Sequence, residues 1–188
     1  MHSVFADLLV VETASVLAGP SVGMFFAELG ARVVKLEHPR NGDVTRSWKL
    51  PAEDPHSPVS AYFSSVNWGK EHRRANLKEM GGRDALDELI CGADILLTNH
   101  LAEDAEKLGL GRDRLRGLNP GLIIGHIKGF AEQPQRPAYD VVLQAETGYI
   151  SMSGTDPEHL AKLPIALVDV LAAHQLKEGL LVALLQRE

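Results

Sequence analysis

The sequence has very little cysteine: Cys91 is the only one among 188 residues. A disulfide within the chain is therefore excluded, and the reducing cytoplasm is the compartment we expect. Cys91 ends an apolar helical segment just before Gly92. We expect it to be a small buried side chain and not a nucleophile.

Long apolar runs and metal-binding patterns are also missing. No apolar stretch approaches the roughly 20 residues that a membrane-spanning helix needs. The first residues, MHSVFADLLVVE, lack the charged-then-apolar pattern of a signal peptide. The eight histidines are scattered, without H-x-H or H-x-x-x-H pairs and without a cysteine at ligand spacing. We therefore expect neither a membrane anchor nor a metal site.

Basic charge is scarce as well. Nineteen Lys and Arg residues stand against 25 Asp and Glu residues, so the formal net charge is −6. Nucleic acid is not an expected partner, because the domains that bind it carry a basic surface. The hydrophobic share of 45% is enough for one α/β domain with its own core.

The segment from Leu8 to Glu37 predicts a strand, a crossover helix and a second, parallel strand. Small residues, Thr13–Gly19, form the loop after the first apolar run. Pro20 suits the first helical position, and Gly30 suits the residue just after the helix. Ligands of such units bind at the loop after the first strand, at the carboxyl edge of the sheet.

This loop does not fit a dinucleotide. Glu37 ends the second strand where a ribose-binding acid would lie, but the turn ASVLAGP has one glycine and lacks G-x-G-x-x-G. Small residues beside a helix amino end still permit a phosphate-bearing or adenine-bearing ligand. NAD is therefore not expected. On these residues alone, a ligand site and a plain turn are equally supported.

Apolar strands and amphipathic helices alternate along the rest of the chain. The long irregular stretch His38–Asn67 is interpreted as a ligand-facing loop. The further predicted strands are Arg73–Leu77, Ile95–Leu97, Leu122–Ile127 and Ile165–Val168. The further predicted helices are Gly82–Ile90, Glu103–Leu108, Arg112–Leu118, Asp140–Glu146 and Asp169–Glu188. We expect an α/β fold: an open parallel Rossmann-like sheet with helices on both faces, ending in a long helix.

Asp169 is the candidate catalytic residue. It follows an apolar segment and opens a helix, whose amino end supplies N–H donors and a potential that keeps a carboxylate ionised. An ionised carboxylate in a cleft can attack an acyl centre and form a covalent intermediate. Asp is also a favoured N-cap, and from the residues alone capping is the more frequent role.

A series of segments matches one known family in the same order. They are LVVE-x-ASVLAGP at Leu9–Pro20, AELGARVVKLE at Ala27–Glu37, GDVTR at Gly42–Arg46, GRDALDEL at Gly82–Leu89, ADILLTN at Ala93–Asn99, KLGL at Lys107–Leu110, LNPGLI at Leu118–Ile123, KGF at Lys128–Phe130, RPAYDVVLQA at Arg136–Ala145 and ALVDVL at Ala166–Leu171. Across nearly its whole length the chain resembles the family III CoA-transferases, the CaiB/BaiF group. This group includes formyl-CoA and carnitine CoA-transferases and, as a branch, α-methylacyl-CoA racemases.

The resemblance implies an acyl-CoA site in which Asp169 is the catalytic aspartate. In the family mechanism this carboxylate attacks the donor thioester to give a mixed anhydride. CoA thiolate then gives an aspartyl-CoA thioester, and the acceptor acid repeats the cycle in reverse. The backbone of Val16, Leu17 and Ala18 matches the place where the family holds the reactive end of CoA. Other positions match the CoA path: His38, Ala75, Asn99, His100, Lys107 and Lys128.

The chain departs from the family at several of these positions. The family's N-x-x-K-R-S is Asn67 to His72 here, which places the acid Glu71 near the expected phosphates. His38 replaces a common arginine, and His100 replaces an aromatic residue. These changes concern the contacts to the CoA phosphates and not the fold.

The resemblance covers only the amino-terminal half of the much longer family subunits. Residues 1–168 match the CoA-binding large domain and 169–188 the start of a long connecting helix, while the small domain and the carboxyl-terminal return segment have no counterpart. Family dimers are interlocked, so the resemblance implies a homo-oligomer or a complementary longer subunit. The last helix leaves little polar face, and we expect its apolar residues to form an interface: Leu176, Leu180, Val182, Leu184 and Leu185.

Three functions stay open at this point. The first is a CoA-transferase, or half of one, whose substrates are an acyl-CoA and a carboxylic acid. The second is an acyl-CoA racemase, which uses a His and an Asp as opposed proton-transfer groups. The racemase branch has a histidine directly before the aspartate matched by Asp140, and Tyr139 stands there in this chain, which favours transfer. The third is a non-catalytic CoA-binding or assembly subunit, which His38, Glu71 and the missing small domain favour.

Overall fold

The computed structural model describes residues 3–187, which form a five-stranded, all-parallel sheet in the order β3-β2-β1-β4-β5. The strands are β1 (Leu9–Glu12), β2 (Arg32–Glu37), β3 (Glu71–Arg74), β4 (Ile95–Thr98) and β5 (Ile123–His126). The helices are α1 (Ala18–Glu28), the 3₁₀ turn η1 (Val44–Ser47), α2 (Ala61–Ser65), α3 (Met80–Cys91), α4 (Ala102–Lys107), α5 (Arg112–Leu118), α6 (Asp140–Glu146), α7 (Tyr149–Ser153) and α8 (Leu167–Arg187). The expected open parallel Rossmann-like sheet is confirmed.

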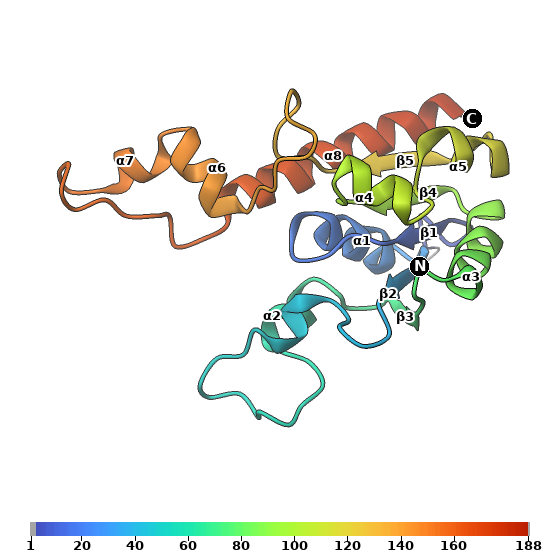
Figure 1. Cartoon of the computed structure of the whole chain (residues 1–188), viewed down its shortest axis with the longest axis horizontal. Helices are drawn as coiled ribbons and strands as arrows, with labels where there is room; N and C mark the ends of the chain where they lie inside the picture. Colours follow the sequence, from blue (N-terminus) through green and yellow to red (C-terminus); the bar gives the residue numbers. More distant parts are fainter. Residues whose placement is uncertain (1–2, 188) are drawn as a thin grey trace.

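The core has two layers because successive strand residues point to opposite faces of the sheet. Val11 and Leu96 face the layer that α3, α4 and α5 cover. Val10 and Ile95 face the layer that α1 and α8 cover. Figure 1 shows α6 and α7 projecting from this body at the amino-terminal end of α8.

Gly30 ends α1 as predicted. Its φ is +97°, and the N–H of Ala31 donates to the carbonyl of Phe26 at 2.9 Å, which is the Schellman pattern. The predicted start is wrong, because α1 begins at Ala18 and Pro20 is its third residue. A proline is tolerated there because the N–H groups of the first helical turn have no partner within the helix.

Two strand predictions need correction. β3 covers Glu71–Arg74, two residues before the predicted Arg73–Leu77. The predicted strand Ile165–Val168 is wrong: this segment is irregular until α8 begins at Leu167. The buried side chain of Gln144 takes the place of a neighbouring strand, accepting from the N–H of Leu163 at 2.8 Å and donating to the carbonyl of Ile165 at 3.1 Å.

The expectation for Cys91 is also wrong, since its side chain is exposed at the end of α3. The buried face of this helix is formed by Leu86, Leu89 and Ile90. Cys91 follows Leu89 and Ile90 in the sequence but does not lie on the buried face of the helix. Its apolar neighbours therefore wrongly predicted that Cys91 is buried.

Candidate functional site

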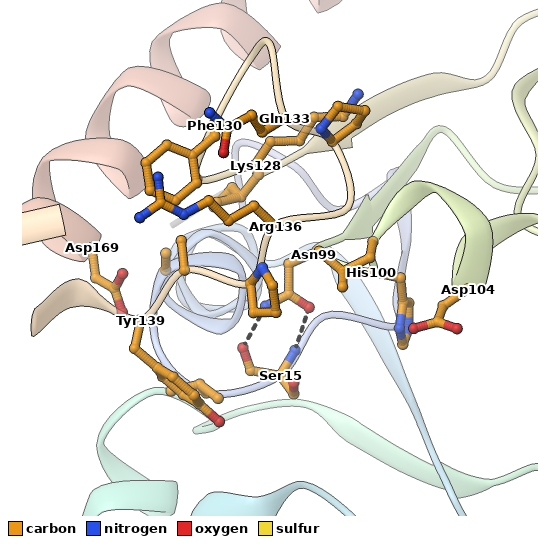
Figure 2. Close-up of a pocket in the computed structure, with 18 of the residues that line it drawn as sticks. Ser15, Asn99, His100, Asp104, Lys128, Phe130, Gln133, Arg136, Tyr139 and Asp169 are labelled. Atoms are coloured by element: carbon orange, nitrogen blue, oxygen red, sulfur yellow. Dashed lines mark hydrogen bonds between the residues drawn. The ribbon is translucent and has the colours of Figure 1, made fainter. Parts of the chain in front are cut away.

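The loop between β1 and α1 is fixed to the neighbouring strand by hydrogen bonds. The N–H of Thr13 donates to the carbonyl of Leu97 at 2.9 Å. Ser15 and the side-chain amide of Asn99 exchange two bonds, of 3.1 and 2.9 Å (Figure 2). Val16 has a φ of +74°, which is a rare conformation for a β-branched residue. The loop thus has one conformation imposed by its surroundings.

A cavity of about 300 Å³ opens on one side of this loop. Segments far apart in the sequence line it: the loop itself, the end of β4, the segment after β5 and the first turn of α8. It gathers most of the residues predicted from the sequence: Val16, Leu17, Ala18, Asn99, His100, Lys128 and Asp169. The rule that ligands bind at the carboxyl edge of a parallel sheet therefore located this cavity correctly.

A second cavity of about 300 Å³ lies on the other side of the loop. The predicted residues His38 and Ala75 line it, and Ser15 and His100 line both cavities. Lys107 lines neither cavity: its side chain is 65% exposed on α4 and lies 3.7 Å from Glu103. The loop therefore separates two adjoining spaces that one elongated ligand could fill together.

Asp169 is the third residue of α8 and is half-buried at the wall of the first cavity. The alternative that it caps this helix is wrong. The N–H groups of Val168 and Asp169 instead donate to Oδ1 of Asp140, at 2.8 and 3.2 Å. Asp140 comes from α6 and supplies the cap, which leaves the carboxylate of Asp169 available to a ligand.

The electrostatics of Asp169 differ from the expectation. Burial, and then the charge of Asp140, raise the pKa of Asp169 to about 6. The positive potential of the helix end is therefore outweighed. At neutral pH the carboxylate is still mostly ionised, and it is less stabilised than a carboxylate in water.

Cationic and aromatic side chains form the wall beside Asp169. The guanidinium of Arg136 lies 3.9 Å from the ring centre of Phe130 and forms an ion pair with Glu146. Figure 2 shows Phe130, Arg136, Tyr139 and Asp169 on one side of the cavity, and His100 with Asp104 on the other. Sequence reasoning did not single out Phe130 and Arg136 as site residues, although both lie after predicted strands, in the KGF and RPAYD segments.

The first residues of the long segment His38–Asn67 border the site. Asn41 and Gly42 line the second cavity. The pKa of Tyr62, on α2, is raised by burial and then by the charge of Asp169, so this phenol lies within electrostatic reach of the candidate nucleophile. Trp48 packs edge-on against Tyr62 at 5.3 Å between ring centres.

Glu37 is occupied by partners within the protein. Its carboxylate accepts two bonds of 2.7 Å from Arg46, one of 2.9 Å from the N–H of Asp43, and lies 2.9 Å from Nδ1 of His72. Burial opposes ionisation, but Arg46 and His72 outweigh it and hold the pKa of Glu37 well below its usual range. This carboxylate is not free to bind a ribose.

The sequence position of Glu71 had suggested that it lies near the CoA phosphates, but Glu71 lines neither cavity. It begins β3, opposite Val34, and pairs with Arg32 at 2.7 Å. Because it lies at the amino end of a parallel strand, it is remote from the carboxyl edge where both cavities open. The acid therefore does not oppose a phosphate in either cavity.

Two findings concern the described residues as a whole. Within residues 3–187, no three His, Cys, Asp or Glu side chains are grouped as metal ligands would be. No helix in that range is long and apolar enough to cross a membrane.

Comparisons with known proteins identify the family. The model of CoA-transferase family III matches residues 5–188. The chain belongs to CoA-transferase family III. It is 34% identical to the succinate–glutarate CoA-transferase of Agrobacterium fabrum over 88% of this chain and 43% of that protein. It is 37% identical to the acetyl-CoA:oxalate CoA-transferase of Acetobacter aceti over 80% of this chain and 38% of that protein.

Solved structures of this family share the fold. The crystal structure of a CaiB/BaiF family protein from Brucella suis matches with a TM-score of 0.89 and 31% identity. The match covers 100% of this chain and 50% of that one. The family III chain therefore spans about half the length of the relatives it matches, and the predicted resemblance to the amino-terminal half of a CaiB/BaiF protein is confirmed.

Proposed function

We propose that this chain is the CoA-binding half of a CoA-transferase that moves CoA from an acyl-CoA donor to a carboxylic acid. The observation that carries the proposal is the first cavity, which brings Asp169 to the loop Val16–Ala18 in a chain of this family. An aspartate whose pKa is raised by burial, next to a rigid loop at a helix amino end, suits attack on a thioester.

CoA lies across the loop and uses both cavities. Its nucleotide end occupies the second cavity, beside His38 and Ala75, and its pantetheine arm passes Ser15 and His100 into the first. The amino end of α1 has no side-chain cap, so its free N–H groups suit a negative or carbonyl oxygen of the ligand. Lys128 and Arg136 supply positive charge near the acyl end.

The reaction proceeds through the carboxylate of Asp169. It attacks the donor thioester carbonyl, CoA thiolate leaves, and a mixed anhydride forms. The thiolate then attacks the aspartyl carbonyl, which releases the donor acid and leaves an aspartyl-CoA thioester. The acceptor carboxylate attacks that thioester, and the returning thiolate takes the acceptor acyl group and frees Asp169.

The geometry supports transfer over racemisation. A racemase needs a histidine opposite its aspartate. Tyr139 stands at the racemase histidine position and lies next to Asp169, whereas His100 comes from a different segment of the chain and lies at the far end of the first cavity beside Asp104 (Figure 2). The non-catalytic alternative, a CoA-binding or assembly subunit, differs from a transferase in forming no acyl adduct on Asp169.

Two measurements on the purified chain test the proposal. Calorimetric titration with CoA should show saturable binding. Incubation with succinyl-CoA, followed by mass spectrometry, should show an adduct that is missing in Asp169→Asn. Binding without an adduct would support the assembly subunit. No heat at millimolar CoA, with a folded chain, would contradict a preformed CoA site.

A further inference from the structure

Four charged side chains are buried together beneath the loop between β1 and α1. They are Glu12 on β1, Lys35 on β2, Asp43 before η1, and Lys70 before β3; each side chain is at most 1% exposed. We call this group the buried ion network. Nothing in the proposed transfer chemistry requires these charges.

The network is continuous and neutral overall. Lys35 Nζ lies 2.8 Å from Glu12 Oε1 and 3.1 Å from Asp43 Oδ2. Lys70 Nζ lies 2.9 Å from Glu12 Oε2. Burial, and then repulsion from Lys35, lower the pKa of Lys70 to about 8 against the attraction of Glu12. Charges placed this deeply contribute little net stability, because their desolvation offsets their attraction.

Three of the network's other hydrogen bonds go to the backbone around the loop, while further ones join Lys70 to Asn67 and Asp43 to Thr45. Lys35 Nζ donates to the carbonyl of Ala14 at 2.6 Å, and Lys70 Nζ donates to the carbonyl of Pro20 at 2.8 Å. Asp43 accepts from the N–H of Val16 at 3.3 Å. The network thus contacts the beginning, the middle and the end of the segment 14–20. The middle contact falls on the residue with the unfavourable φ of +74°.

Gly23 shows that the packing of α1 is adapted to this network. A Cβ at this helical position would overlap Glu12 Oε2 and would lie 3.2 Å from Lys70 Nζ. Glycine weakens a helix relative to alanine. Its presence here leaves room for the Glu12 carboxylate between two lysines.

We infer that Glu12, Lys35, Asp43 and Lys70 are positioning residues, which hold the segment 14–20, the loop with the first turn of α1, ready for acyl-CoA and do not serve mainly to stabilise the fold. The inference rests on the proposed function for its ligand. A loop that is already fixed loses less conformational freedom when it binds, so fixing it increases affinity. The strained conformation of Val16 then persists because side chains on three other segments hold the loop around it.

The test is the double variant Glu12→Gln/Lys70→Met, which removes one charge of each sign and leaves the Lys35–Asp43 pair in place. The Kd for CoA should rise about tenfold, which corresponds to about 1.4 kcal/mol and to the freeing of about one residue's backbone. The melting temperature should stay near that of the parent. Amide hydrogen exchange without ligand should become faster at residues 15–19 and stay unchanged in β4.

The matched control is Arg32→Met/Glu71→Gln, which removes an exposed ion pair between β2 and β3. It should change neither the Kd nor the exchange of the loop. Equal CoA affinity and equal loop exchange in the folded double variant would overturn the inference. Failure of the double variant to fold would also overturn it, because the network would then be a stability element. If the parent itself does not bind CoA, the proposed function fails, and the exchange comparison still decides whether the network holds the loop.

Discussion

Asp140 has two effects on Asp169, and they can be separated by substitution. Its Oδ1 caps α8, and its negative charge adds to the burial that raises the pKa of Asp169 to about 6. Asp140→Asn keeps an oxygen for the cap and removes the charge. Asp140→Ala removes both, and loss of a cap costs about 1 kcal/mol.

We predict that Asp140→Asn lowers the pKa of Asp169. Transfer requires the ionised nucleophile, so the rate of the parent should fall as the pH drops through about 6. In Asp140→Asn this fall should move to lower pH. The melting temperature should fall modestly, because the amide nitrogen replaces the oxygen that accepts from Gln144 Nε2. The measurement is the pH dependence of adduct formation. If the rate falls at the same pH in the variant and the parent, the charge of Asp140 does not affect the pKa of Asp169.

Asp169→Asn should abolish the adduct and raise the stability at pH 7. The pKa of Asp169 is about 6 in the folded chain, against an ordinary 3.8. The folded state therefore holds more protons than the unfolded state between these values, and stability falls as the pH rises through that window. Asn carries no charge and escapes this cost.

The check is the melting temperature of Asp169→Asn and of the parent at pH 7 and pH 5. The variant should melt higher at pH 7, and the difference should shrink at pH 5. A lower melting temperature for Asp169→Asn at pH 7 would contradict the burial argument. Adduct formation in this variant near the parent rate would remove Asp169 from the mechanism.

At the scale of single elements, replacing a helical glycine by alanine should have opposite effects on stability at two positions. An added Cβ at Gly179 in α8 meets nothing within 4 Å, whereas at Gly23 in α1 it overlaps the fixed carboxylate of Glu12. Gly179→Ala should stabilise the chain by about 1 kcal/mol, which is the difference in helix propensity. Gly23→Ala should destabilise it in spite of the same gain. Chemical denaturation of both variants measures the two signs, and a stabilising Gly23→Ala would mean that Glu12 can move aside.

The elements that could be predicted from the sequence are those whose apolar pattern is complete. Four strands lie inside the sheet or are covered by helices, namely β1, β2, β4 and β5. Their sequences are apolar runs because they are buried, and these runs predict the strands. β3 is an edge strand with all four residues exposed, so periodicity carries no signal for its limits. Ile165–Val168 was predicted as a strand because it is apolar, but the carbonyl of Ile165 and the N–H of nearby Leu163 bond to the side chain of Gln144. No local pattern predicts a partner of that kind.

The candidate site was predictable only in part, for a similar reason. The loop after β1, Asn99 and Lys128 follow strands, and parallel strands bring their carboxyl ends to one edge. The capping of α8 by Asp140 and the φ of Val16 depend on tertiary contacts. One signal for the buried ion network was present in the sequence: Lys35 interrupts the apolar run of β2, and a lysine that is buried on both sides requires partners.

At the scale of the whole molecule, α8 has one covered and one open face. Ala173 and Leu180 are buried against the sheet, and Leu176 and Leu184 pack beside them. The expectation that these leucines form an exposed surface is therefore wrong for Leu176, Leu180 and Leu184. The open face lies on the side of α8 that points away from the sheet. It carries four exposed apolar side chains: Val170, Leu171, Val182 and Leu185.

We predict that this open face drives self-association. Leu171 is 48% exposed, Val182 53% and Leu185 72%, and exposed apolar side chains that share one side of a helix favour an interface. Light scattering of the purified chain should therefore give a mass above the 20.4 kDa of a single copy. Leu171→Gln/Leu185→Gln should lower the mass toward that value without unfolding the chain, because neither side chain belongs to the core.

The control for this prediction is Met80→Gln, which removes a side chain that is 81% exposed at the start of α3, outside the open face of α8. It should leave the mass unchanged, since a single exposed apolar residue is ordinary on a protein surface. A parent chain that stays a monodisperse monomer at high concentration would contradict the prediction. A mass that falls equally in Met80→Gln and in the double variant would show general stickiness, and α8 would then not be the interface.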